Sequence, residues 1–197
     1  MKSYILETDA AEEPITLAEV KTALRIDGTD YDSILTPLIK TARQIGEKIT
    51  GRDFVNKTWK LYIDDFPSSD SEGIKIEKSM LQSISSIKYY INDVLTTYSS
   101  SNYYKTYDTN YSWIYLVDGQ SYPVIDDRKQ AVEIIFVSGY GASASDVPQA
   151  IKQALISMVV ALYENAGDCA ESSDGQIAQF KYLFSGYIIP QKLVRVW

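Results

Sequence analysis

The chain has 197 residues, of which 45% are apolar and 23% charged, with a formal net charge of −7 and a pI near 4.7. This length and composition predict one soluble domain that buries its own core without disulfides or metals. The acidic balance argues against a surface that grips nucleic-acid phosphates, because such surfaces need clustered Lys and Arg. With no histidine and a single cysteine, Cys169, the chain has neither an internal disulfide nor a Cys–His pair.

The first residues carry no apolar signal segment, and no apolar run approaches the length of a membrane span. We therefore expect a soluble protein made in a reducing cytoplasm, with no membrane contact.

A first helix is predicted to begin at Thr16, with Glu19 completing a capping box. Ile15 and Val20 occupy the positions of a hydrophobic staple across this start. The helix is expected to end around residues 26–28, where a glycine follows the last apolar residue.

A second, longer helix is predicted from a cap at Thr29 or Asp30 to Gly51. Pro37 lies inside it, so we expect either a kink or a helix that begins near Thr36. The two helices form a hairpin that needs a third surface to cover its apolar stripe. The stripe of the second helix consists of Ile34, Leu35, Leu38, Ile39, Ala42, Ile45 and Ile49.

From residue 56 the periodicity changes to alternation, which predicts a series of short strands up to residue 138. Trp59, Leu61 and Ile63 share one face of the first strand. Asn92-Asp93 is typical of a tight hairpin turn, and Ala131–Val137 is apolar enough to be a central strand.

A third helix is predicted from Asp146, as cap, to Asn165, with Pro148 in its first turn and Gln149 completing a second capping box. Its apolar residues occupy two faces. Such a helix is covered on both sides, either inside the domain or against another subunit. The residues of the second face are Ile156, Val159 and Val160.

These elements predict an α+β fold: a helical bundle made by the N-terminal helix pair (12–52) and the C-terminal helices (146–185), with an inserted antiparallel β lobe (56–138). The C-terminal helices are the long third helix and a short one, Gln176–Phe184. An apolar tail (186–197) follows, which either docks on its own domain or reaches a neighbour. Its candidate contact residues are Tyr187, Ile188, Ile189, Leu193, Val194 and Trp197.

No phosphate-binding loop, dinucleotide motif, metal-ligand spacing or nucleophile elbow is present. The acidic pairs Asp64-Asp65 and Asp126-Asp127 either cap turns or converge as the cation site of a small hydrolase. The tyrosine-rich stretch 98–115 is either a structural sheet or a sugar- or peptide-binding surface. We predict no catalytic residue, no cofactor and no metal, and hence no enzyme.

Several motifs, taken in order, resemble the head–tail connector (adaptor) family of long-tailed phages and prophages, over about residues 12–165. Each motif is weak alone, whereas their order and spacing are fairly specific. The motifs are the run Glu13–Asp27, Thr50–Arg52, Thr58–Leu61, Ile84–Tyr89, Val137–Gly141, Asp146–Pro148 and Tyr163–Asn165.

The resemblance implies a structural virion protein that forms a twelvefold ring beneath the portal and above stopper or tail-completion proteins. DNA would pass through its channel without sequence-specific binding, which suits an acidic chain. The free protein would be either a ring or a monomer that assembles on its portal. The alternatives from other classes are a tyrosine-rich carbohydrate- or peptide-binding module and the small metal-dependent hydrolase.

Overall fold

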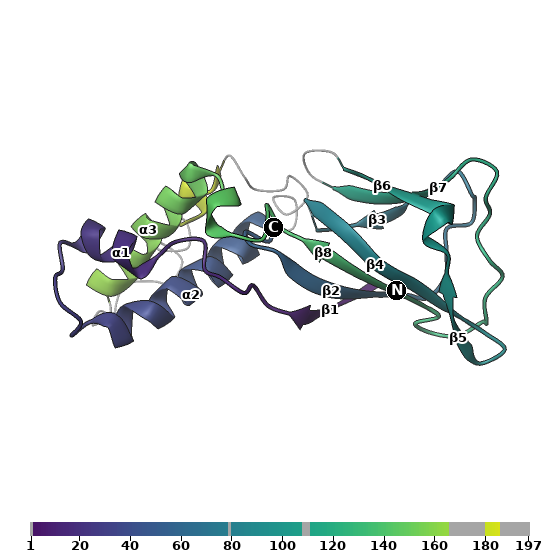
Figure 1. Ribbon diagram of the computed structural model, residues 1–197, viewed down its shortest axis with the longest axis horizontal. Helices are drawn as coiled ribbons and strands as arrows, with labels where there is room; N and C mark the ends of the chain where they lie inside the picture. Colours follow the sequence, from purple (N-terminus) through teal and green to yellow (C-terminus); the bar gives the residue numbers. More distant parts are fainter. Residues whose placement is uncertain (1, 79, 108–110, 166–179, 186–197) are drawn as a thin grey trace, which may run out of the picture. The chain divides into compact units, whose positions relative to one another are not determined.

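The computed structural model describes residues 2–78, 80–107, 111–165 and 180–185. The chain divides into two compact units (Figure 1). The β unit comprises residues 1–10 and 56–140, and the helical unit comprises residues 11–55 and 141–197. Each unit is therefore assembled from two separate stretches of the chain.

The described part of the β unit contains eight strands in two antiparallel sheets. The larger sheet has the order β1 (Lys2–Thr8), β2 (Lys57–Ile63), β8 (Val132–Ser138), β4 (Leu81–Ile91), β5 (Val94–Tyr98). The smaller sheet has the order β3 (Ile74–Ile76), β7 (Ser112–Leu116), β6 (Tyr103–Tyr107), and a short 3₁₀ turn, η1 (Ser100–Asn102), precedes β6. The apolar strand β8 is central, as predicted.

The core of the β unit lies between the two sheets. Leu61 on β2 and Ile134 on β8 meet Ile76 on β3 and Ile114 on β7, and all four are at most 1% exposed. Each fully buried aliphatic side chain of this size contributes about 1.5–3 kcal/mol relative to exposure. Alternation along β2 and β8 places these residues on one face, so the sequence pattern and the sandwich agree.

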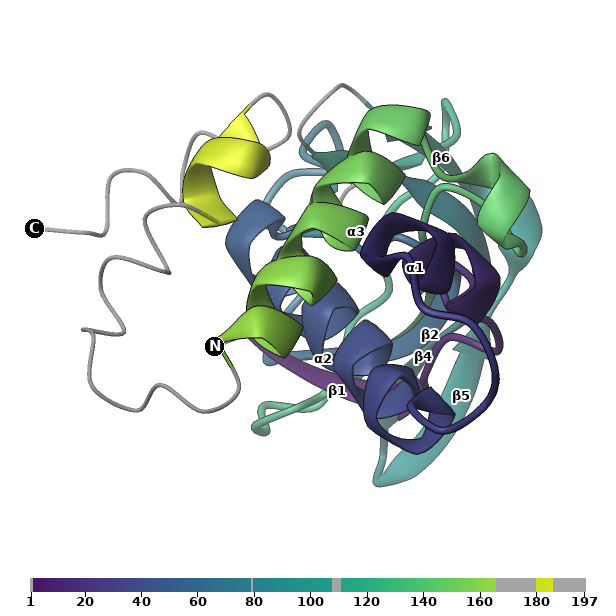
Figure 2. The same ribbon diagram turned by 90° about the vertical axis from the view of Figure 1, so that its left-hand side faces the viewer.

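The helical unit contains α1 (Leu17–Leu24), α2 (Asp32–Thr50) and α3 (Gln149–Glu164), with a short 3₁₀ turn, η2 (Ala144–Asp146), before α3. The three helices pack against one another (Figure 2). The capping box of Thr16 and Glu19 is confirmed, and the staple residues Ile15 and Val20 are both buried.

Two helix starts differ from expectation. Helix α2 begins at Asp32 and continues through Pro37, so the predicted start near Thr36 is wrong. Helix α3 has Pro148 as its N-cap, whereas Asp146 forms a capping box in the preceding turn η2. The proline rather than the aspartate therefore sets the start of α3.

The predicted fold class, a helical bundle around a long C-terminal helix with an inserted β lobe, is wrong. Strand β1 precedes the helices and pairs with β2, so the β unit is not an insertion. Helix α3 has 16 residues and is shorter than α2, which has 19. In the described residues eight antiparallel strands form two sheets, so the fold is not a bundle around one long helix.

Candidate functional site

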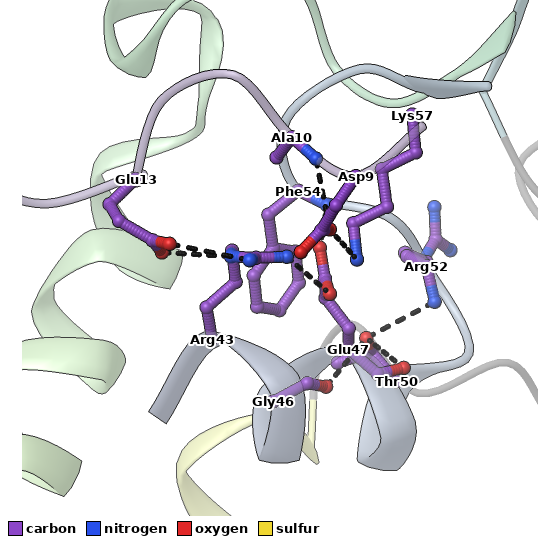
Figure 3. A network of polar contacts seen from close by, with 10 residues as sticks. All are labelled: Asp9, Ala10, Glu13, Arg43, Gly46, Glu47, Thr50, Arg52, Phe54 and Lys57. Atoms are coloured by element: carbon purple, nitrogen blue, oxygen red, sulfur yellow. Dashed lines mark hydrogen bonds and ion pairs between the residues drawn. The ribbon is translucent and has the colours of Figure 1, made fainter. Parts of the chain in front are cut away.

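A buried arginine in the helical unit belongs to the network of polar contacts that Figure 3 shows. Arg43 on α2 is 1% exposed, yet its guanidinium carries a full charge. Its Nε donates to Glu13 Oε2 at 2.8 Å, its Nη2 to Glu13 Oε1 at 3.3 Å and its Nη1 to Glu47 Oε2 at 3.2 Å. Two carboxylates therefore neutralise the buried cation with directed hydrogen bonds.

The network also fixes the backbone on both sides of α2. Glu47 Oε1 accepts a hydrogen bond at 3.1 Å from the backbone N–H of Phe54, which follows the helix. Glu13 belongs to the segment that enters α1. Arg43 and Glu47 thus hold the chain before α1 and the chain after α2 against one helix.

A close approach of two backbones determines the turn after β8. Gly139 has φ +148°, and a Cβ built on it would lie 2.7 Å from the backbone N and Cα of Asn56. Its N–H donates to Met80 O at 3.1 Å. Glycine is the only residue that combines this conformation with this approach.

The acidic pairs lie in turns of the β unit. Asp64 accepts from Gln130 N at 3.0 Å and from Lys129 Nζ at 3.2 Å. Asp126 accepts from the N–H groups of Asn92 and Asp93 at 2.9 and 2.8 Å and so closes the β4–β5 turn. Both residues of that turn have positive φ, which confirms the predicted tight hairpin.

The four acidic residues line one open hollow together with residues 123–125. Across the described part of the chain, however, His, Cys, Asp and Glu side chains form no group of three that could hold a metal ion. Because Asp64 and Asp126 bind backbone N–H groups, the turn interpretation accounts for these two residues.

The tyrosine-rich stretch places aromatic side chains along the smaller sheet. Tyr115 stacks on Trp113 with ring centroids 6.0 Å apart, and Tyr104 lies 6.1 Å from Tyr115. Lys75 Nζ lies 3.6 Å from the centre of the Tyr111 ring. Tyr104 is half exposed and, with Tyr115, lines a hollow of about 440 Å³. An aromatic surface is therefore present, as the binding-module alternative requires.

None of the helices in the described ranges is both long and apolar enough to cross a membrane.

The family follows from a comparison with protein-family models. The model described as "Phage gp6-like head-tail connector protein" matches residues 14–115, which is just over half of the chain. The chain belongs to this family. It is a structural connector protein of the phage type, and the predicted family resemblance is confirmed.

Solved structures share the connector's fold. One is a chain from "Virion of native gene transfer agent (GTA) particle", with TM-score 0.75, 18% identity and 94% coverage of both chains. A second, from the neck of an empty particle computed with C6 symmetry, has TM-score 0.72, 17% identity and coverage of 90% and 94%. A third, from the neck of a native particle computed with C12 symmetry, has TM-score 0.64, 17% identity and coverage of 91% and 94%. No curated protein matches the chain.

The network around Arg43 lies largely within the matched region, because the family match begins beside Glu13 and spans α1 and α2. Sequence reasoning missed this network. The signal was a charged pair four residues apart, Arg43 and Glu47, on the face of α2 that also holds Ile39 and Ala42.

The predicted contact residues of the connector fall into two groups. Ile156 and Val159 on α3 are buried in the helical unit and Val160 is half-buried, so their contact with another subunit stays a prediction. The remaining predicted contacts, Tyr187, Ile188, Ile189, Leu193, Val194 and Trp197, lie outside the described residues.

Proposed function

We propose that this connector is a subunit of a twelvefold ring in the virion neck, beneath the portal and above the stopper or tail-completion proteins. The family match over residues 14–115 carries this proposal. The shared fold with chains from gene transfer agent necks, computed with C6 and C12 symmetry, supports it. The protein would be made in the host cytoplasm and reach the virion by assembly.

In this proposal DNA passes through the ring without sequence-specific binding. The net charge of −7 supports a conduit, because an acidic channel repels phosphates and does not retain them. A surface that bound DNA tightly would slow its passage. The role is structural, in keeping with the family.

The two units would act together as one connector domain. We assign the apolar tail, residues 186–197, as an arm that reaches the portal, because it gathers apolar residues such as Ile188, Ile189 and Trp197. Of the three predicted contacts on α3, Val160 is the half-buried one, and we assign it to the contact with a neighbouring subunit.

Light scattering across a concentration series tests the ring directly, for the full chain and for a chain truncated after Gly186. Rings, or a concentration-dependent rise in mass that the truncation abolishes, support the proposal and the role of the tail. If both the full and the truncated chain are monomers, the next experiment measures binding to the cognate portal ring. Failure to bind the portal refutes the proposed place beneath the portal and favours a ligand for the aromatic hollow of Tyr104 and Tyr115.

A further inference from the structure

The larger sheet of the β unit ends in two open edges, β1 and β5. In β1, Ile5 is 50% exposed and its neighbour Leu6 is 41% exposed. In β5, Val94 is 61% exposed and its neighbour Leu95 is 40% exposed. Adjacent residues of a strand point to opposite faces of the sheet. Exposure of both neighbours therefore means that the strand edge, rather than one sheet face, is uncovered.

The faces of the exposed residues correspond between the two edges. Leu6 pairs with Trp59 and Val94 pairs with Ile91, so both lie on the face that packs on the smaller sheet. Ile5 pairs with Lys60 and Leu95 with Tyr90, which places them on the opposite face. Each edge thus presents one apolar residue above the sheet and one below it.

Features that protect natural sheet edges are nearly absent from the centres of these strands. In β1, Lys2 lies at the start, and both Glu7 and a register shift between Leu6 and Thr8 lie near the end. Strand β5, Val94–Tyr98, contains neither a charge nor a proline. Open edges of this kind pair with further strands unless they are blocked.

We propose that in the ring the β5 edge of one copy pairs with the β1 edge of the next copy, so that the five-stranded sheet continues across the subunit boundary. The inference rests on the proposed ring and names the contact that builds it. Ring contacts are head-to-tail, so each copy needs two different, complementary surfaces. The two edges of one sheet meet this requirement, whereas pairing of β1 with itself would close a dimer.

The direction of the shared pair follows from the topology. All four neighbouring pairs from β1 to β5 are antiparallel, so the direction reverses four times and β1 and β5 run the same way. The small rotation between neighbouring copies of a twelvefold ring does not reverse that direction, so the pair between copies is parallel. With Leu6 opposite Val94 on one face, the parallel register places Ile5 opposite Asp93 on the other face and leaves Leu95 diagonal to Ile5.

Engineered disulfides test this pairing in the full chain, with Cys169 replaced by Ser. Edges separated by four strand spacings lie about 19 Å apart in one copy, too far for a disulfide within it. The double variant Leu6→Cys/Val94→Cys should therefore give a ladder of linked copies under mild oxidation. The matched control, Leu6→Cys/Tyr104→Cys, joins the same edge to an exposed residue of the smaller sheet and should give no ladder.

Charge substitutions supply a second readout that does not depend on cysteine chemistry. Leu6→Lys and Val94→Glu are changes at exposed positions that face each other in this register, so circular dichroism should show an unchanged fold. Each alone should abolish self-association, and mixing the two should restore it because Lys then meets Glu at the junction.

The oxidation is run on free protein and on protein bound to its portal ring, beside light scattering of the unmodified chain. Association without a ladder above the control overturns the edge pairing but leaves the ring intact. Dimers from Leu6→Cys alone, in place of a ladder, also overturn it, because they show β1 pairing with itself. Absence of both self-association and portal binding refutes the proposed ring, and the edge pairing with it.

Discussion

Replacing the buried arginine of α2 by methionine should destabilise the helical unit strongly. Arg43→Met keeps an unbranched apolar chain in the site but removes the charge that neutralises Glu13 and Glu47. Glu47 has a side chain only 8% exposed, so its carboxylate would remain in a poorly solvated site. Breaking a buried pair in this way costs about 3–5 kcal/mol. Against a total stability of about 5–15 kcal/mol, this loss is large.

The measurement is denaturant unfolding of the variant followed by far-ultraviolet circular dichroism, which reports the helices. Lys40→Met is the matched control, because it places the same residue on the same helix at an exposed position. The control should change the free energy of unfolding by less than about 0.5 kcal/mol.

A double variant separates the charge from the packing. Glu47→Gln removes the partner's charge but keeps an oxygen that can accept from the N–H of Phe54. Combined with Arg43→Met, it should cost less than the sum of the single changes, with a coupling of about 0.5–3 kcal/mol. If Arg43→Met costs no more than Lys40→Met, the network does not hold the helical unit and this reasoning fails.

Three further changes test other parts of the fold. Thr16→Ala should cost about 1 kcal/mol through loss of the α1 cap, measured by thermal unfolding; no change would contradict the capping role. Gly139→Ala should lower the free energy of unfolding by more than about 1 kcal/mol, because a Cβ would meet the backbone of Asn56. The control is Gly119→Ala, where nothing lies within 4 Å. An equal loss in the control would mean that the positive φ alone, and not the contact, causes it. Burial raises the pKa of Tyr4 from 10.0 to about 12. Burial of the neutral Tyr4 side chain therefore stabilises the fold fully below pH 10, and this stabilisation is lost as the pH rises to about 12. The loss is under about 3 kcal/mol. In alkaline unfolding curves, Tyr4→Phe should reduce this loss.

Elements with local signals could be predicted from the sequence. The capping box at Thr16, the hairpin turn at Asn92-Asp93 and the central strand around Ile134 each depend on neighbouring residues or on one periodicity. The family could also be predicted, because its motifs occur in order along the chain.

Strand β1 could not be predicted, and its absence from the expected elements led to the wrong fold class. Alternation marks strands with one buried and one exposed face. At an edge both faces are partly exposed, so adjacent apolar residues such as Ile5 and Leu6 carry no such signal. Only pairing with β2, more than fifty residues away, defines this strand.

The core-facing side of α2 also departs from its apolar pattern. Ile45 and Ile49 were expected to face the core but are half-buried, whereas Gly46 is buried and admits the rings of Phe54 and Phe184. Phe54 stacks on Phe184 at 5.9 Å. This packing involves Phe184, which is distant in sequence from α2. The periodicity of one helix therefore cannot predict it.

The separation of β1 from β2 has a consequence for synthesis on the ribosome. Strand β1 emerges first, yet its partner becomes available only after the whole of α1 and α2 has been made. Helices α1 and α2 in turn wait for α3, which follows the last strand. The β unit cannot finish folding before β8 has been made, and the helical unit cannot finish before α3 has been made. The apolar edge of β1 therefore stays exposed during this part of translation. Chaperone binding to the nascent chain should therefore be concentrated on β1 until β2 has been made.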